Sequence, residues 1–291
     1  MNATDTTQAS ASHRVRRTRN RLAGLAAAAA ITVGALAGPV LGSAAAASAA
    51  TTPSWLMGAG TLAGINAVAP SMTSSVLNSP TTYGAGTSLS GNPIQPGLAA
   101  TPVLTYTSYA QFASDIAAGR IHFHYQWVMY DPEKWAATPV NEQQNPALYM
   151  TLFGQLAHAH GLKVIMAPAM DLGYVSGAVN PWHFGETIVQ WYLNSGLVAT
   201  AATAGDLVNI QAESQTTSLP AYDALFNGAA AQARAANPAV QVFAEVSTVN
   251  GTVPQMTAAA ESVSPDGYYV AAPGAAAEAA QFVQNMTAAG F

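Results

Sequence analysis

The sequence has no cysteine and few charged residues. None of its 291 residues is Cys, and Asp, Glu, Lys and Arg together account for 8% of the chain. A disulfide framework is therefore excluded, so the stability of the fold must come from a buried core. Hydrophobic residues make up 50% of the sequence, and a chain of this length can bury a substantial core in one large domain.

Basic residues are especially scarce beyond the first fifty positions. Five of the nine Lys and Arg residues lie at positions 14–21, which leaves four of them against thirteen acidic residues, a formal net charge of −9. Binding of nucleic acid or of an anionic membrane surface needs clustered Lys and Arg. Both are therefore poor partners, and a glycan or another small neutral substrate suits the chain better.

The first fifty residues have the pattern of an export signal. Five arginines at positions 14–21 precede an uncharged apolar run at 22–41, and the small-residue stretch that follows contains Ala47-Ser48-Ala49. We predict a signal peptide over residues 1–50, a secreted or extracellular protein, and no stable membrane anchor after cleavage. Because the apolar run is about long enough to span a bilayer, a retained anchor is the alternative.

The remaining chain divides into two parts that differ in composition and in hydrophobic pattern. Residues 51–101 are rich in Thr, Ser, Gly, Pro, Ala and Asn and show no sustained helix or strand period. We predict an irregular leader there. Between residues 102 and 291, strand patterns alternate with helix patterns, which favours a parallel sheet with crossover helices. The predicted strands lie near residues 103–106, 125–130, 162–167, 206–211, 240–246 and 266–270.

Strict alternation is compatible with two folds, a (β/α)8-type (TIM-like) barrel and an open parallel sheet. Open doubly wound sheets usually carry a glycine-rich nucleotide loop, and no turn here has that spacing. We therefore predict the barrel over residues 102–291. Since only six strands are evident, the barrel is incomplete or its first units are degenerate, with a further strand hidden near "WLMGAG" at residues 55–60.

Acidic residues follow the ends of four predicted strands. Residues two apart on a strand share a face, and catalytic side chains of barrels lie at the C-terminal strand ends. This pattern pairs Asp131 with Glu133 and Gln211 with Glu213. It also places Glu245 and Asp171 at the same end of the barrel. The alternative for each of these residues is a structural role, in which the side chain caps a turn or lies in a solvent-exposed loop.

Aromatic and histidine residues give weaker signals. Trp135, Trp182 and Tyr268 fall near strand ends, where a flat apolar ring can pack on a sugar, although core packing explains them equally well. His122 and His124 resemble a metal-binding H-x-H pair, but they precede their strand and so should lie at the wrong end of the barrel. We predict no metal and no cofactor.

Four segments resemble secreted (β/α)-barrel proteins of the glycoside hydrolase type. They are "YDPEKW", "LAHAHGLKVIMAP", "VNIQAE" and "FAEVS". The resemblance covers residues 102–290 and implies carboxylate catalysis at Glu133, Glu213 or Glu245. Of these, we expect Glu213 to be the acid and Glu245 the nucleophile or base. The substrate-binding residues expected beside them are Asp131, Asp171, Gln211, Trp135, Trp182 and Tyr268.

The first hypothesis is thus a secreted glycosidase that uses paired carboxylates. The alternative is a non-catalytic carbohydrate-binding or cell-envelope protein on the same scaffold, because fold does not determine function. An exported structural protein is a third possibility. The sequence leaves the substrate and the oligomeric state open.

Overall fold

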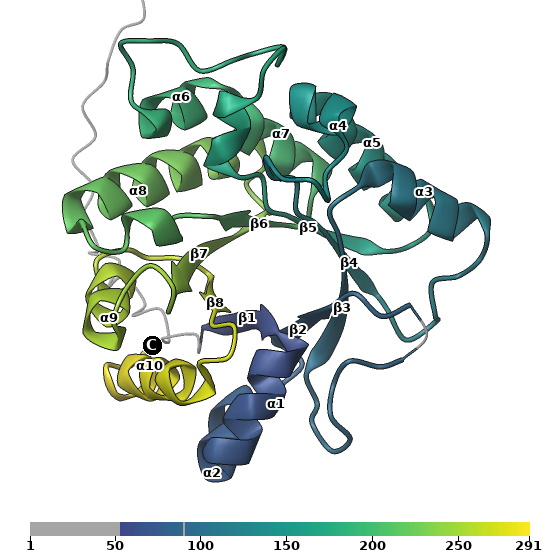
Figure 1. Ribbon diagram of the computed structural model, residues 1–291. Helices are drawn as coiled ribbons and strands as arrows, with labels where there is room; N and C mark the ends of the chain where they lie inside the picture. The colour runs from purple at the N-terminus through teal and green to yellow at the C-terminus, as the bar shows by residue number, and fades with distance from the viewer. Residues whose placement is uncertain (1–52, 90) are drawn as a thin grey trace, which may run out of the picture. The chain divides into compact units, whose positions relative to one another are not determined.

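The chain forms a closed barrel of parallel strands surrounded by helices (Figure 1). The computed structural model describes residues 53–89 and 91–291, so the predicted signal peptide lies outside the described residues. Among these residues, no helix is both long and apolar enough to cross a membrane. The strands are β1 (Ser54–Gly58), β2 (Thr82–Gly86), β3 (Thr101–Tyr106), β4 (Trp127–Tyr130), β5 (Lys163–Met166), β6 (Leu207–Ile210), β7 (Gln241–Ser247) and β8 (Gly267–Ala271).

Pairing between the first and last strands closes the barrel. β1 runs parallel to β8, in a register that sets Ser54 opposite Gly267 and Met57 opposite Val270. Every other strand pairs in parallel with its neighbour in the sequence. The predicted barrel is therefore confirmed, all six predicted strands are present, and the open-sheet alternative is excluded.

The segment predicted as an irregular leader supplies the first two strands instead. After β1 come the helices α1 (Ala59–Val68) and α2 (Pro70–Met72) and the π-helical turn η1 (Thr73–Leu77), and β2 follows them. The prediction for residues 51–101 was wrong because small residues stand where the chain packs most closely. A Cβ atom on Gly84 would lie 2.2 Å from Ile94, so the packing favours glycine at this position of β2, and the strand has a weaker strand pattern than the later ones.

The outer helices follow the predicted alternation with the strands. In the connection from β5 to β6, Gly196, with φ of 78°, separates two helices. Gly is the residue that adopts this left-handed conformation at little cost. The remaining helices are α3 (Tyr109–Ala117), α4 (Val140–Gln144), α5 (Pro146–Ala159), α6 (Ile188–Asn194), α7 (Leu197–Ala204), α8 (Leu219–Ala236), α9 (Val253–Glu261) and α10 (Ala276–Ala288).

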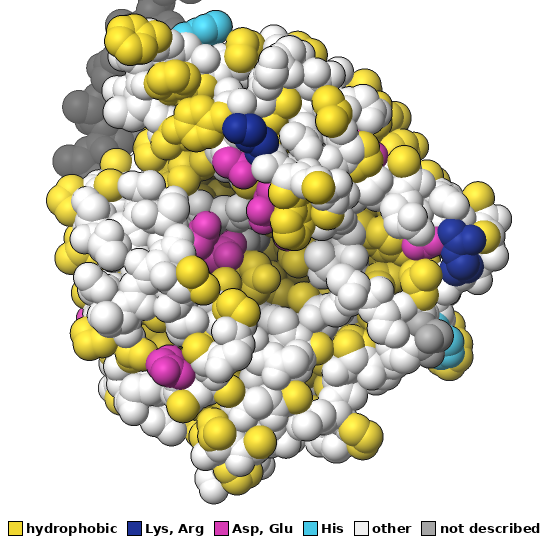
Figure 2. Space-filling model, in the orientation of Figure 1, with side chains coloured by type: hydrophobic (Ala, Val, Ile, Leu, Met, Phe, Trp, Pro, Cys, Tyr) yellow, Lys and Arg dark blue, Asp and Glu magenta, His cyan; other side chains and the backbone are white. Residues whose placement is uncertain are grey.

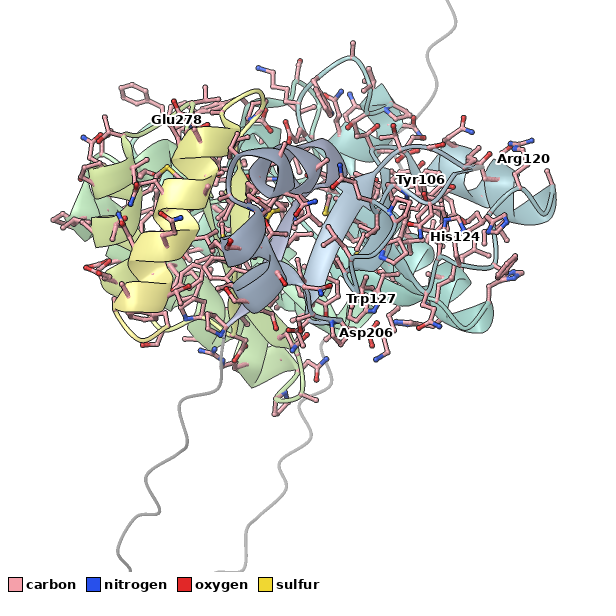
Figure 3. All side chains as sticks on the ribbon, turned by 90° about the horizontal axis from the view of Figure 1, so that it is seen from below. Tyr106, Arg120, His124, Trp127, Asp206 and Glu278 are labelled. Carbon is pink, nitrogen blue, oxygen red and sulfur yellow. The ribbon has the colours of Figure 1, made fainter. Side chains whose placement is uncertain are left out.

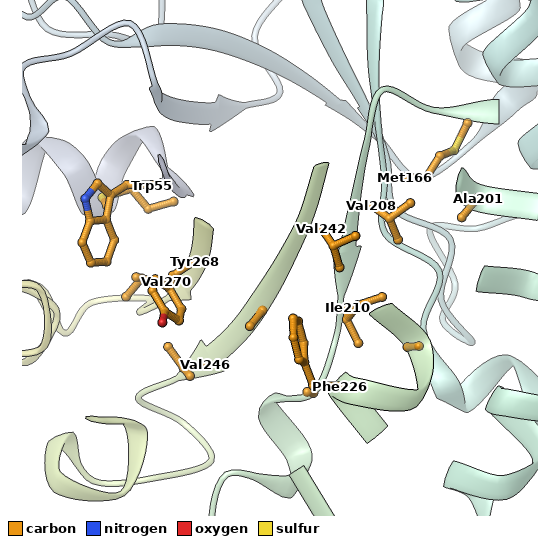
Figure 4. Packing of buried hydrophobic residues seen from close by; sticks show 14 of the residues in the cluster. Trp55, Met166, Ala201, Val208, Ile210, Phe226, Val242, Val246, Tyr268 and Val270 are labelled. Carbon is orange, nitrogen blue, oxygen red and sulfur yellow. The ribbon is translucent and has the colours of Figure 1, made fainter. Parts of the chain in front are cut away.

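Alternate residues of each strand enter two separate hydrophobic clusters. On β7, Val242 and Val246 point outward to the helices, while Phe243 points into the barrel. Figure 4 shows the outer cluster, in which side chains of neighbouring strands meet the helices around them. The inner cluster fills the barrel with large side chains. Its buried members are Leu56, Tyr83, Val103, Trp127, Met129, Ile165, Ala167, Leu207 and Phe243.

The contact between α5 and α7 depends on a glycine, which yields a test of the packing. A Cβ atom on Gly154 of α5 would lie 2.2 Å from the carbonyl oxygen of Ala204. We expect G154A to lower the free energy of unfolding by about 1–3 kcal/mol through overpacking. In G60A, on α1, the added methyl group meets no atom within 4 Å, so this variant should be neutral or slightly stabilised. Urea denaturation of both variants checks the expectation, and equal stability would contradict it.

Candidate active site

Carboxyl groups gather at the C-terminal end of the barrel, where β4 to β7 end. The alternation of side chains persists beyond the last residue of each strand. Asp131 and Glu133 therefore follow the inward face of β4, and Gln211 and Glu213 follow the inward face of β6. Glu245, on the inward face of β7, completes the arrangement. Figure 2 shows the acidic side chains along one side of a hollow with hydrophobic side chains at its floor. The predicted spacing therefore brings these residues together.

A cavity of about 200 Å³ lies between the strand ends. Glu133, Asp171, Gln211, Glu213 and Glu245 line it, together with Ala169, Met170 and Ser214. Asp171 belongs to the 3-10 turn η2 (Met170–Tyr174), and Glu213 begins the similar turn η3 (Glu213–Gln215). Short turns directly after the strands thus hold two of the acidic side chains over the barrel. Figure 3 shows the opposite end, where Trp127 and Asp206 lie at the strand starts.

Two amide side chains hold the deeper carboxylates in place. Asn209 Nδ2 donates a hydrogen bond of 2.6 Å to Glu245 Oε2. Gln211 Nε2 donates to Asp131 Oδ1 at 2.8 Å and to the carbonyl oxygen of Ala167 at 2.9 Å. The side-chain donors of both amides are therefore used within the site. Glu245 is only 7% exposed and Asn209 is fully buried, so this part of the site is fixed by the barrel itself.

Among the described residues, no Lys, Arg or His forms an ion pair with the acidic side chains of the cavity. In the described part of the chain, the ion pairs involve Asp115, Asp206 and Asp266, which all lie away from the cavity. Lys134 is the nearest basic residue in sequence, but its Nζ atom lies 5.8 Å from the ring centroid of Tyr174. Its backbone N–H, rather than its ammonium group, donates to Asp171 Oδ1 at 2.9 Å. The negative charge of the cavity is thus left to protonation or to a ligand.

Burial and mutual repulsion raise the pKa values of these acids. Burial and then the charge of Glu213 raise the pKa of Glu245 well above its usual range. Burial, Glu133 and Glu213 do the same for the pKa of Asp131, and burial with Asp171 raises the pKa of Glu213. Burial with Asp171 and Glu213 raises the pKa of Glu133 to about 7. Burial and the neighbouring negative charges therefore favour the protonated forms of these four acids.

The two predicted tryptophans stabilise loops instead of lining the cavity. Trp135 Nε1 donates to Thr138 Oγ1 at 2.9 Å in the connection from β4 to α4. Trp182 Nε1 donates to the carbonyl oxygen of Glu186 at 2.9 Å, and its ring packs edge-on against Tyr174. Neither ring reaches the cavity, so the structure does not support their predicted role in substrate binding.

Tyr268 is also absent from the site, and its neighbour takes its place. Tyr268 points outward, packs on Trp55 and donates to the carbonyl oxygen of Ala260 at 3.1 Å. Tyr269 points inward, opposite Glu245 in the strand register. Charges on Glu245 and three other carboxylates, after burial, raise the pKa of Tyr269. The two-residue strand period would have chosen Tyr269, since it shares the inward face with Gly267 and Ala271.

Two other buried acids serve the fold. Glu142, fully buried on α4, accepts hydrogen bonds from the backbone N–H groups of Tyr109 and Ala110, at the start of α3. Asp115 accepts from Arg120, and also from the hydroxyl group of Tyr106 at 3.0 Å. Because their oxygens are occupied, neither acid is available for chemistry. They were not distinguishable from catalytic acids by sequence, except that they lie on helices.

The histidine pair lies where the sequence placed it. His122 and His124 precede β4, at the end of the barrel opposite the carboxylates, and their Nδ1 atoms contact each other. Among the described residues, no group of three or more His, Cys, Asp or Glu side chains is arranged to hold a metal ion.

Comparison with known proteins gives no family. No protein-family model and no curated protein matches the sequence. Among solved structures, orotidine 5'-monophosphate decarboxylase from Methanocaldococcus jannaschii, complexed with the inhibitor BMP, aligns with 80% of this chain and 97% of its own. The identity is 10% and the TM-score 0.39, so the match transfers no activity to this chain.

The predicted glycoside hydrolase function is corrected by these findings. The solved structure named above is a decarboxylase and not a glycoside hydrolase, and no protein-family model or curated protein matches the chain in support of glycoside hydrolysis. The segments that suggested the resemblance are strand ends and a helix-to-strand junction. Any (β/α) barrel needs such segments, so they indicated the fold and not the activity.

The raised pKa of Glu133 predicts a specific dependence of stability on pH. Between pH 5 and 8 the folded protein holds a proton that the unfolded chain has released, because burial and nearby charges raise the pKa of Glu133 to about 7. The free energy of unfolding therefore falls as pH rises through this range. Wild type should lose on the order of 1–2 kcal/mol more than E133Q, after a discount for partial exposure. Urea denaturation at several pH values checks this, and parallel losses would contradict it.

Proposed function

We propose that the protein is an enzyme that transfers protons to and from a small substrate at the carboxylate cavity. The observation that carries this proposal is the pair of the partly exposed Glu213 and the buried Glu245, which both line the cavity and whose pKa values are raised by burial and by neighbouring charges. Two carboxyl groups that cannot both ionise supply one acid and one base at the same pH. The cavity position at the C-terminal strand ends is the usual place for catalysis in barrels.

Glu245 suits the role of the general acid. It is the more deeply buried of the two, and its Oε2 atom is fixed by Asn209 at 2.6 Å. Its other oxygen, Oε1, makes no hydrogen bond within the described residues. Burial disfavours the ionised form, so Glu245 holds its proton at neutral pH and delivers it from a fixed position. This exchanges the roles expected from the sequence, in which Glu213 was the acid.

Glu213 then acts as the base at the rim of the cavity. It begins the turn η3 and is partly exposed, and its Oε2 atom is buried without a hydrogen-bond partner among the described residues. A carboxylate oxygen without a partner can accept a proton from a substrate. Asp131, Glu133, Asp171 and Gln211 surround the pair and are placed to orient polar groups of the substrate.

Export of the protein remains part of the proposal. Its support is the order of a basic region, an apolar run and a small-residue site within residues 1–50, which is the pattern of a secretory signal. A cysteine-free enzyme of this kind needs no oxidising compartment to fold, so the acid–base proposal holds in either location.

Turnover measurements with substituted glutamates test the proposal. A panel of small esters, amides and carbonyl compounds is screened by NMR for conversion by the wild-type protein. For any compound converted, we expect E245Q and E213Q each to lower kcat by about 10²–10⁴-fold, since each removes one proton-transfer group. E261Q, which changes an exposed acid at the end of α9, is the matched control and should keep full activity.

Two outcomes would refute the acid–base assignment. One is conversion by E245Q and E213Q at the wild-type rate, with the fold verified by circular dichroism. The other is equal loss of activity in E261Q, which would trace the effect to net charge instead of to the cavity.

A further inference from the structure

We infer that the cavity binds a small organic cation, with an ammonium group held between the carboxylates. This inference rests on the proposed function, because the same side chains face the ligand, and it adds the chemical class of that ligand. It departs from the neutral substrate expected from the composition of the chain.

Hydrogen-bond acceptors without partners are the first observation. The Oδ1 atom of Asn209 is buried and has no donor among the described residues, and the same holds for Glu213 Oε2. Asn209 is fully buried inside the barrel, and its Nδ2 atom is already committed to Glu245 at the cavity wall. A buried acceptor that lacks a donor costs about 1–3 kcal/mol. A ligand that brings several N–H donors removes this cost.

Uncompensated charge is the second observation. Five acidic side chains surround or adjoin the cavity, namely Asp131, Glu133, Asp171, Glu213 and Glu245, and no described Lys, Arg or His forms an ion pair with them. Protonation of the deepest groups relieves only part of the repulsion among these five side chains. A cation placed among them gains from every remaining charge.

An aromatic ring is the third observation. Tyr269 packs on the inner cluster and lies opposite Glu245 in the strand register. The face of an aromatic ring attracts ammonium groups, and more strongly where water is excluded. A ring beside the carboxylates is therefore complementary to an ammonium group that carries an aliphatic chain.

Size and donor geometry restrict the cation further. A cavity of about 200 Å³ equals the volume of roughly seven water molecules, which fits a ligand of about six non-hydrogen atoms. The described acids include no group of three arranged for a metal ion, so an inorganic divalent ion is a poorer fit than an amine. A short aliphatic diamine meets both restrictions.

Calorimetric titration with 1,4-diaminobutane tests the inference. We expect one molecule to bind per chain at pH 7.5, and E213Q to weaken binding about tenfold or more, because hydrogen bonds to a charged group are lost. D171N, which keeps the acceptor for the Lys134 N–H, should weaken it similarly and serves if E213Q does not fold. Butane-1,4-diol, the neutral isostere, should not bind at the same concentrations. E261Q is the charge-matched control and should bind as wild type does.

Several results would overturn the inference. They are equal binding of the diol, equal binding of the diamine by E213Q and D171N, no binding up to millimolar diamine, or displacement of the diamine by Ca²⁺ or Mg²⁺. Its failure is separable from that of the proposed function. If the diamine does not bind but E245Q strongly lowers kcat, only the inference of a cationic ligand is refuted. If the diamine binds but E245Q turns over at the wild-type rate, only the acid–base role is refuted.

Discussion

Repulsion among carboxyl groups that share one end of the barrel is the interaction on which the account of this site depends. Asp131, Glu133, Glu213 and Glu245 lie close enough to raise each other's pKa values, and burial adds to the effect. Such an arrangement opposes folding unless protons or a cation neutralise it. The protein tolerates this cost at one place, and a cost confined to one cavity is characteristic of a functional site.

Packing in the rest of the barrel offsets the unfavourable repulsion among the carboxyl groups of the site. Two hydrophobic clusters, one inside the strands and one between strands and helices, run through the fold. Acids outside the cavity are neutralised in ordinary ways, as when Arg120 binds Asp115 or when backbone N–H groups at the start of α3 bind Glu142. The cavity differs from these places because, in the described part of the chain, its acids form no ion pair.

Much of the fold could be predicted because strand and helix periods alternate so regularly. The strand ends followed from the same pattern, since a two-residue period carries the inward face from Met129 to Asp131 and from Asn209 to Gln211. Of the first two strands, β1 lies where a hidden strand was expected, near "WLMGAG". The second strand could not be predicted, because Gly84, Ala85 and Gly86 are small and Ile94 packs against Gly84. Tyr268 was chosen over Tyr269 because aromatic character was weighed without the strand period.

The activity could not be predicted in the same way. Sequence pattern located Glu213 and Glu245 correctly, but their relative burial follows from contacts made after folding, above all from Asn209 to Glu245. The proposed assignment of acid and base, which exchanges the roles expected from the sequence, depends on that difference in burial. The resemblance to glycoside hydrolases rested on strand-end segments that any barrel contains. It therefore indicated the fold and gave no information about the reaction.

Direct titration of the Glu245 carboxyl group tests the central claim most sharply. With ¹³C-labelled glutamate, the side-chain carboxyl resonance missing from E245Q identifies Glu245, and its chemical shift is followed from pH 4 to pH 9. We expect Glu245 to remain protonated through pH 7 and E213Q to lower its pKa, because removal of one charge relieves the repulsion. Ionisation near the ordinary value of about 4.3 for Glu, unchanged by E213Q, would contradict it.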